Sequence, residues 1–287
     1  MVTVKLMGGL GNQMFQYAIG RSLAQDLGEK LFLDVSFYDM IHVNATARHY
    51  ELHHLNIQGK LFTPGFISKY WKYFLNFIIK RCPTNYHNYV IEKNLSYSPI
   101  IIGDKKNPYL DGYWQCEKYF KHNEDLIRRD FQVVAPQSCV NKRWSDIILK
   151  SSSVCLHVRR GDYVTDSGAN QIYGTRSTDY YDKAIAHISN YVDKPVFFVF
   201  SDDLEWTKTN LSIPYEVHYM DQNGPDEDYE DLRLMTQCKY YIIANSTFSW
   251  WGAWLGNYVD KIVVCPKNWF NDPDMKTDII PDSWVKI

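Results

Sequence analysis

The stretch His157-Val158-Arg159-Arg160-Gly161-Asp162-Tyr163 places two adjacent arginines directly after a short apolar run that starts at Ser153. The apolar and β-branched residues of that run predict a buried strand that ends just before Arg159. In open α/β sheets, ligands bind outside the carboxyl ends of the strands. Arginine stays charged at physiological pH and grips a phosphate through paired hydrogen bonds. The stretch therefore indicates either a phosphate site or a pair of surface ion pairs.

The composition is that of a soluble globular protein with two domains. Of its 287 residues, 45% are hydrophobic and 22% are charged, and a chain of this length is at the size where one core gives way to two. The aromatic content of 16% suits a ligand-binding cleft. A formal net charge of -2 gives no general attraction to nucleic acid, so any basic function has to be local.

Cysteine usage and the first residues favour a cytoplasmic protein. The six cysteines form no C-x-x-C pair, which favours reduced, buried thiols over a disulfide scaffold or a zinc site. The chain begins with Val2-Thr3-Val4-Lys5-Leu6, which lacks the layout of a signal peptide. The sequence contains no run of about 18 apolar residues, which is the length that a membrane-spanning helix requires.

The first residues predict a strand, a glycine turn, a helix and a second strand. Thr3–Leu6 reads as a strand, and Gly8-Gly9-Leu10-Gly11-Asn12-Gln13 follows as a turn that allows close approach of a ligand to the backbone. A helix with apolar residues at helical spacing comes next, and we expect Gly28 to end it before a strand at Leu31–Asp34. The pattern is a weak dinucleotide fingerprint, because the third glycine of G-x-G-x-x-G is missing.

Two segments between Ser36 and Gln115 carry functional alternatives. Residues 69–81 alternate aromatic and aliphatic residues with lysine and arginine, which is typical of an interfacial amphipathic helix and also of a helix that packs on the protein's own core. Asp111-Gly112-Tyr113-Trp114-Gln115 offers the aromatic rings and amide that bind a sugar, although packing at a domain junction explains it equally well.

The second half repeats a strand-helix unit, and we expect an N-terminal domain of residues 1–150 and a C-terminal domain of residues 151–287. Three apolar runs end at polar clusters, which are Arg159–Arg160, Ser201-Asp202-Asp203 and Asn245-Ser246-Thr247-Phe248-Ser249. Strands that alternate with helices form a parallel, right-handed sheet, in which the ends of these strands lie on one edge. The sequence therefore predicts that the three clusters converge.

The converging groups suit a nucleoside diphosphate. Arg159 and Arg160 can neutralise a diphosphate, and Ser246, Thr247 and Ser249 begin a helix whose amino end also favours an anion. Ordinary helix capping is the alternative for these hydroxyls.

Asp202 or Asp203 can accept two hydrogen bonds from guanine, or cap the helix that follows. Asp226-Glu227-Asp228 has the D-x-D spacing of a metal site on a sugar nucleotide, but acids before a helix also merely complement its dipole.

The chain resembles the α-1,2-fucosyltransferases of glycosyltransferase family 11. The resemblance rests on Gly8–Tyr17 as an N-terminal signature, on His157–Tyr163 as an H-x-R-R-x-D motif, and on the two later blocks that begin at Ser201 and Asn245. The resemblance covers almost the whole chain. It implies a GT-B-like pair of Rossmann-like domains with parallel sheets, in which the C-terminal domain holds GDP-L-fucose and the N-terminal domain receives the acceptor. It implies no metal requirement and no cofactor.

The mechanism that the resemblance implies is inversion, in which a galactose 2-hydroxyl attacks the fucose anomeric carbon as GDP departs. Arg159 and Arg160, with Asn12 and the Ser246 region, would stabilise the charge that grows on the leaving group. His157 would shape the site or hold the donor. Asp162 would orient Arg159, and the general base stays open, with Asp162 and Asp166 as candidates.

The acceptor is not identified by the sequence. The resemblance and the basic aromatic segment favour a galactose-terminated, lipid-linked precursor of O-antigen or another surface polysaccharide, met at the inner face of a bacterial inner membrane. Two alternatives are a transferase of the same architecture that uses another sugar nucleotide, and a nucleotide- or glycan-binding module without catalysis.

Overall fold

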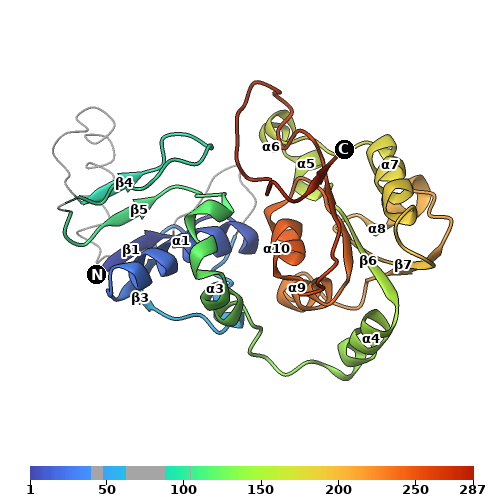
Figure 1. Cartoon of the computed structure of the whole chain (residues 1–287), viewed down its shortest axis with the longest axis horizontal. Coiled ribbons are helices and arrows are strands. Elements are labelled where there is room, and N and C mark those ends of the chain that lie inside the picture. The colour runs from blue at the N-terminus through green and yellow to red at the C-terminus, as the bar shows by residue number, and fades with distance from the viewer. Residues whose placement is uncertain (40–47, 63–87, 104) are drawn as a thin grey trace. The chain divides into compact units, whose positions relative to one another are not determined.

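A computed structural model of the chain describes residues 1–39, 48–62, 88–103 and 105–287. The described residues form two compact units (Figure 1). The first unit is Met1–Phe131 with Thr277–Ile279, and the second is Gln132–Lys276 with Ile280–Ile287. Each unit is built on its own parallel sheet, which confirms the predicted pair of α/β domains.

The sheet of the first unit has the strand order β3-β2-β1-β5-β4 in the described part of the chain. Its strands are β1 (Val2–Lys5), β2 (Leu31–Asp34), β3 (Lys60–Phe62), β4 (Tyr89–Ile91) and β5 (Tyr109–Asp111). The helices are α1 (Leu10–Asp26) and α3 (Glu124–Asp130), with 3-10 turns at Leu52–His54, Glu117–Tyr119 and Lys121–Asn123. Val2 and Val4 of the central strand β1 are fully buried, so the core lies on this strand.

Helix α1 ends at a glycine, as predicted. Gly28 has a φ of +63°, a left-handed conformation that glycine adopts without strain. The amide of Glu29 donates to the carbonyl of Ala24 at 2.8 Å, and the amide of Gly28 donates to that of Gln25 at 3.2 Å. These two bonds form a Schellman motif, which satisfies carbonyls that the helix end leaves free.

The sheet of the second unit has the order β11-β10-β9-β6-β7-β8. Its strands are β6 (Ser152–Val158), β7 (Pro195–Ser201), β8 (Glu216–Tyr219), β9 (Tyr240–Ile242), β10 (Val263–Cys265) and β11 (Val285–Lys286). The helices are α4 (Cys139–Lys150), α5 (Gly161–Thr165), α6 (Ser167–Ile172), α7 (Thr178–Ser189), α8 (Leu204–Asn210), α9 (Asp228–Thr236) and α10 (Thr247–Leu255).

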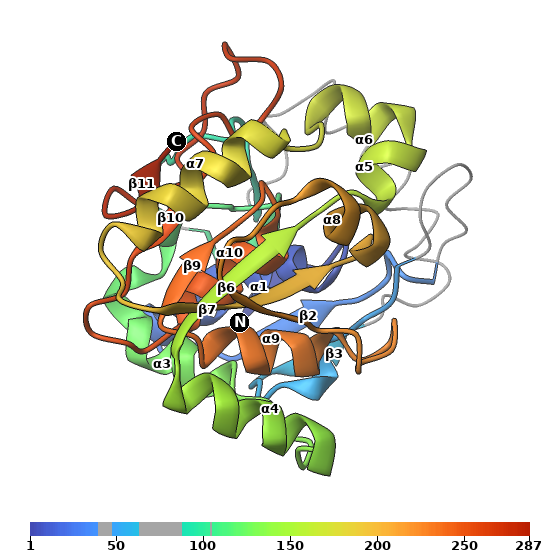
Figure 2. The same ribbon diagram turned by 90° about the vertical axis from the view of Figure 1, so that its right-hand side faces the viewer.

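Strand β6 lies inside the second sheet, between β9 and β7 (Figure 2). Its side chains alternate between the two faces of the sheet. Val154, Leu156 and Val158 join the buried cluster that includes the inner face of α7. On the opposite face, the ring of His157 lies 6.0 Å from that of Phe248 in α10, measured between centroids. The strand is therefore covered on both faces, which explains its almost continuous apolar sequence.

The strand order of the second sheet reverses between β6 and β9. The chain runs from β6 to β7 and β8 on one side, and then returns to β9 and β10 on the other. All these pairs are parallel, so the carboxyl ends of β6, β7 and β9 lie at one edge. A ligand crevice forms at such a switch point. The predicted strand arrangement is confirmed.

The boundary between the units differs from the predicted one at residue 150. The first unit ends at Phe131, and helix α4 belongs to the second unit. The ring of Trp144 in α4 lies edge-on to Phe198 of β7, with centroids 6.4 Å apart, and Asn141 donates to Oδ1 of Asn223 at 2.8 Å. The amphipathic pattern of α4 predicts a helix but does not say which of two cores it covers.

The described cysteines are free thiols. Cys116, Cys155, Cys238 and Cys265 are buried, as expected, whereas Cys139 is exposed at the start of α4. Burial raises the pKa of Cys116 to about 11 and that of Cys265 to about 12, so these two thiols stay protonated at neutral pH.

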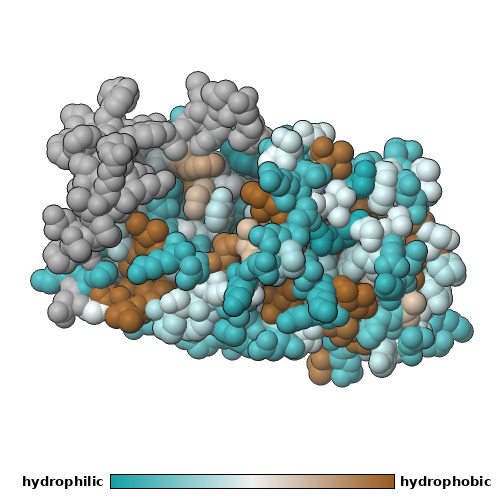
Figure 3. Space-filling model, turned by 90° about the horizontal axis from the view of Figure 1, so that it is seen from above, coloured by the Kyte–Doolittle hydropathy of each residue, from teal (hydrophilic) through white to brown (hydrophobic). Residues whose placement is uncertain are grey.

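The predicted amphipathic segment at residues 69–81 lies outside the described residues. Among the described helices, none is both long enough and apolar enough to cross a bilayer. On the face drawn in Figure 3, the described hydrophobic residues lie among hydrophilic ones. Contact with a membrane therefore stays a prediction.

Lys261 is expected to stabilise the end of α10. Its ammonium group donates to the carbonyls of Ala253, Trp254 and Gly256 at 2.9, 3.1 and 2.8 Å. Lys261→Ala should lower the free energy of unfolding by about 2 kcal/mol, because it removes charge-assisted hydrogen bonds from partly buried carbonyls. Denaturant unfolding measures this loss. Lys267→Ala, at an exposed position, is the control and should change stability by less than about 0.5 kcal/mol.

Candidate functional site

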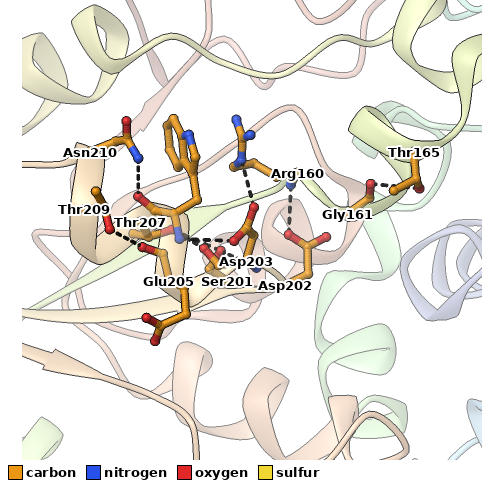
Figure 4. Close-up of polar contacts among 11 residues, drawn as sticks. Arg160, Gly161, Thr165, Ser201, Asp202, Asp203, Glu205, Thr207, Thr209 and Asn210 are labelled. Atoms are coloured by element: carbon orange, nitrogen blue, oxygen red, sulfur yellow. Dashed lines mark hydrogen bonds and ion pairs between the residues drawn. The ribbon is translucent and has the colours of Figure 1, made fainter.

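Three carboxylates hold the two arginines that follow β6, and Figure 4 shows the contacts of Arg160 with Asp202 and Asp203. Oδ1 of Asp162 accepts from Nε and Nη2 of Arg159 at 3.1 and 2.7 Å, and Oδ2 of Asp202 lies 3.0 Å from Nη1. Oδ1 of Asp202 also accepts from the backbone amide of Arg160 at 2.8 Å, while Nε of Arg160 donates to Asp203 at 3.1 Å. The arginines are thus parts of one network and not separate surface pairs.

Arg159 is held on two sides by carboxylates. Burial disfavours its charged form, but Asp202 and Asp162 outweigh this effect and raise the pKa of the guanidinium. The contacts above use three of its five N–H donors. The guanidinium is therefore fixed in orientation and keeps donors for a further acceptor.

Arg160 has more unused donors than Arg159. Its guanidinium carbon lies 3.9 Å from the ring centroid of Trp206, so the cation stacks on the indole. Only Nε contacts a carboxylate, and within the described part of the chain the two terminal amino groups make no hydrogen bond. Figure 4 shows these groups directed away from Asp203. They form a fork that matches a phosphate oxygen pair.

Gly161 allows the close approach of Asp202 to the arginines. A Cβ atom at this position would lie 2.6 Å from Oδ2 of Asp202, which is too short for a non-bonded contact. Since both oxygens of Asp202 are held by Arg159 and Arg160, this carboxylate has little freedom to move aside. The packing of Asp202 therefore requires a glycine at position 161.

Asp203 caps a helix, which was one of its two predicted roles. Its Oδ1 accepts from the amide of Trp206 at 3.1 Å and its Oδ2 accepts from Arg160. Asp202 contacts both arginines. The structure thus gives each aspartate a protein partner, and guanine recognition by either stays a prediction.

Asn245, after β9, connects three segments through its buried amide. Nδ2 donates to the carbonyls of Tyr173 at 2.9 Å and Trp269 at 3.1 Å, while the backbone carbonyl of Asn245 accepts from the Tyr163 hydroxyl at 3.0 Å. Oδ1 is buried and has no partner in the described part of the chain. Asn245 therefore shapes this edge of the sheet and keeps one acceptor.

The hydroxyls at the start of α10 differ in exposure. Ser249 is fully buried and donates to the carbonyls of Ala244 and Ser246 at 3.4 and 3.2 Å, so it stabilises the first turn. Ser246 is 6% exposed at the N-cap, and its side chain makes no capping bond. Thr247 is the first helical residue. Ligand binding by Ser246 and Thr247 stays a prediction.

His157 is a neutral residue of the core. It is 5% exposed, and burial together with the charge of Arg159 lowers its pKa to about 3. Its Nδ1 is buried without a partner among the described residues. A role of His157 in shaping the site or in holding the donor stays a prediction, and the low pKa argues against acid-base catalysis by His157 near pH 7.

Asn12 lies in the first unit, in the first turn of α1, because the helix begins at Leu10, inside the predicted glycine turn. Its Oδ1 accepts from Nε2 of Gln115 at 2.9 Å. Gly8 has a φ of +79°, and a Cβ there would lie 2.6 Å from Nδ2 of Asn12. The turn therefore packs around Asn12, and a contact between Asn12 and a ligand stays a prediction.

The structure adds two aromatic supports that the sequence analysis did not select. Trp206 supports Arg160, and the ring of Tyr163 stacks on that of Tyr173 with centroids 5.2 Å apart. Trp206 is three residues beyond the capping Asp203, in the first turn of α8. This spacing was visible in the sequence, but a tryptophan in a helix is more often part of the core.

No group of three or more metal-binding side chains occurs in residues 1–39, 48–62, 88–103 and 105–287. In the D-x-D segment, Oε2 of Glu227 accepts from the amide of Gly224 at 2.7 Å, and Asp228 begins α9. These contacts are those of a helix start. Metal-independence stays a prediction.

His157 should make stability depend on pH below about 6.5. The folded protein protonates His157 only near pH 3, whereas the unfolded chain does so near its usual pKa of 6.5. The stability that neutral His157 contributes is therefore present above pH 6.5 and is lost as the pH falls towards 3, at up to about 1.4 kcal/mol per pH unit.

Denaturant unfolding between pH 7 and pH 4 measures this loss, and His157→Gln should show a shallower decline because glutamine does not titrate. An imidazole NMR signal of His157 that titrated near pH 6.5 would contradict the prediction.

One family model and several known proteins match this chain over most of its length. The model of the family described as Glycosyl transferase family 11 matches residues 1–287. The chain is 36% identical to an alpha-1,2-colitosyltransferase of Escherichia coli, across 100% of this chain and 98% of that protein. It is 34% identical to the O-antigen biosynthesis glycosyltransferase WbnK of E. coli, across 98% and 99%. Human galactoside alpha-(1,2)-fucosyltransferase 1 is 26% identical, across 88% of this chain and 65% of that protein.

A solved structure shares the fold. The NodZ alpha-1,6-fucosyltransferase, from Bradyrhizobium, soaked with GDP-fucose superposes with a TM-score of 0.50 over 88% of this chain and 91% of that one. The two sequences are only 16% identical, so the likeness concerns the fold. It agrees with the expected GT-B-like pair of domains.

Proposed function

The chain belongs to glycosyltransferase family 11, and we propose that it transfers L-fucose from GDP-L-fucose to the 2-hydroxyl of an acceptor galactose in α-1,2 linkage. The observation that carries the proposal is the pair of arginines held by three carboxylates at the switch point of the second sheet. The likeness of the whole chain to WbnK supports a place in the synthesis of O-antigen or another bacterial surface polysaccharide.

The diphosphate of the donor fits the unused donors of the two arginines. The terminal amino groups of Arg160 and the remaining N–H groups of Arg159 can bind its oxygens. Negative charge grows on the diphosphate as the bond to the anomeric carbon breaks, so fixed cations bind the transition state more strongly than the ground state. Asp162 and Asp202 fix Arg159 in advance, which reduces the reorganisation that the reaction requires.

The contacts of the two candidate bases favour leaving-group stabilisation over a strong general base. Asp166 accepts from the amides of Gly168 and Ala169 at 2.8 and 3.1 Å and so caps α6. Asp162 binds Arg159. The acceptor hydroxyl would attack from the side opposite to the departing GDP, which inverts the anomeric centre.

The second candidate donor is GDP-colitose. The relative at 36% identity is named a colitosyltransferase, and colitose is the 3-deoxy analogue of L-fucose. The two donors therefore differ by a single hydroxyl. A site that hydrogen-bonds a substrate hydroxyl rejects the deoxy analogue by about 10⁴-fold or more, whereas an apolar pocket rejects an added hydroxyl by only about 10²-fold.

Steady-state transfer to a β-linked galactoside from each donor tests the proposal. We expect a kcat/KM for GDP-L-fucose that exceeds that for GDP-colitose by about 10⁴-fold. A higher value for GDP-colitose would select the second candidate, and transfer from neither donor to any β-galactoside would reject both.

Arg159→Ala and Arg160→Ala should each lower kcat for transfer by about 10²- to 10³-fold, the usual effect of removing one group that stabilises a developing anion. Arg128→Ala is the matched control, since Arg128 pairs with Glu124 on helix α3 of the first unit. Wild-type rates in the Arg160 variant would contradict the proposed diphosphate contact. Circular dichroism of each variant checks that the fold is intact.

A further inference from the structure

Glu92, at the end of β4, grips the loop that follows the neighbouring strand β5. Oε2 of Glu92 accepts from the amide of Tyr113 at 2.7 Å, and Oε1 accepts from the amide of Trp114 at 3.0 Å. A Cβ at Gly112 would lie 2.4 Å from Cβ of Glu92, so only glycine allows this approach. Both strands are parallel, and their carboxyl ends lie at one edge of the first sheet.

The loop of residues 112–115, which we call the Tyr113 loop, is held in a costly conformation. Trp114 has a φ of +56°, a left-handed conformation that is rare for a bulky residue. Its indole is buried against Tyr119, with ring centroids 5.5 Å apart, and its N–H has no partner among the described residues. Strain and an unsatisfied donor in one residue are typical of a segment that is kept for function.

The result of this geometry is an exposed aromatic ring beside a carboxylate. Tyr113 is 38% exposed, whereas its neighbours Trp114 and Gln115 are 3% and 8% exposed. Gln115 donates to Asn12 in the first turn of α1. Burial raises the pKa of Glu92, while the two amides act in the opposite sense. Each oxygen of Glu92 has one amide partner and can accept another hydrogen bond.

We propose that the Tyr113 loop is a binding platform for the acceptor sugar, in which Tyr113 stacks on the apolar face of a galactose and Glu92 accepts a hydrogen bond from one of its hydroxyls. A pyranose has one face of C–H groups and a rim of hydroxyls, and an aromatic ring beside a half-buried carboxylate matches both. The inference rests on the proposed function in that it identifies the sugar with the acceptor of the transfer reaction.

Tyr113→Ala should raise the KM for a β-galactoside about tenfold, which corresponds to about 1.4 kcal/mol of lost contact. The KM for the GDP-sugar, and the rate of its hydrolysis without acceptor, should stay as in the wild type. Tyr258→Ala is the matched control, because Tyr258 in the second unit is also 38% exposed. Tyr113→Phe should keep most of the affinity, since it keeps the ring.

Glu92→Gln tests the carboxylate. The amide group of glutamine can accept at only one of the two positions, so the variant should also raise the KM for the acceptor and leave that for the donor unchanged. Thermal unfolding shows whether the first unit is intact. An unchanged KM for the acceptor in either Glu92→Gln or Tyr113→Ala would overturn the platform.

Saturation-transfer NMR measures the binding of β-galactosides in the absence of a donor. This experiment tests the platform independently of the proposed donor. Transfer of fucose with an unchanged acceptor KM in Tyr113→Ala would overturn the platform and leave the function intact. Galactoside binding that depends on Tyr113, without transfer from either GDP-sugar, would support the platform and reject the donors. A wild-type protein that bound no galactoside would overturn the platform together with the proposed acceptor.

Discussion

The bridge that Asp202 makes between Arg159 and Arg160 is the interaction on which the candidate site depends. It joins the ends of two neighbouring strands, because Asp202 follows β7 and the arginines follow β6. The register of β6 and β7, which pairs Val158 with Ser201, brings these residues to the same level. Gly161 leaves the space that the carboxylate fills. A change in any of these three features would move the cations.

The carboxylates of the network hold the two arginines in place in the absence of a ligand. Two guanidiniums face three carboxylates, and each carboxylate touches the edge of an arginine while other donors stay unused. Partly buried charges are costly unless they are paired, so the carboxylates make it possible to keep two cations in one place without a ligand. The neutral state of His157 avoids a third positive charge beside them.

Much of this could be predicted from the sequence, because parallel βαβ topology fixes which strand ends share an edge. Strands β1, β2, β6, β7 and β9, the glycine that ends α1 and the convergence of the three polar clusters followed from local sequence patterns, whereas β3, β4, β5, β10 and β11 were not predicted. The partners of individual side chains did not follow from such patterns. Helix α4 has one apolar face that fits either core, and the partners of Asp202 depend on packing between segments distant in sequence. The stack of Arg160 on Trp206 needed coordinates.

Asn245 holds its surroundings through main-chain atoms. Its amide nitrogen donates to the carbonyls of Tyr173 and Trp269, and a carbonyl is present whatever the side chain. Substitutions at positions 173 and 269 can therefore alter the shape and chemistry of this wall of the second unit while the Asn245 anchor persists. Replacement of Asn245 itself would release both segments at once.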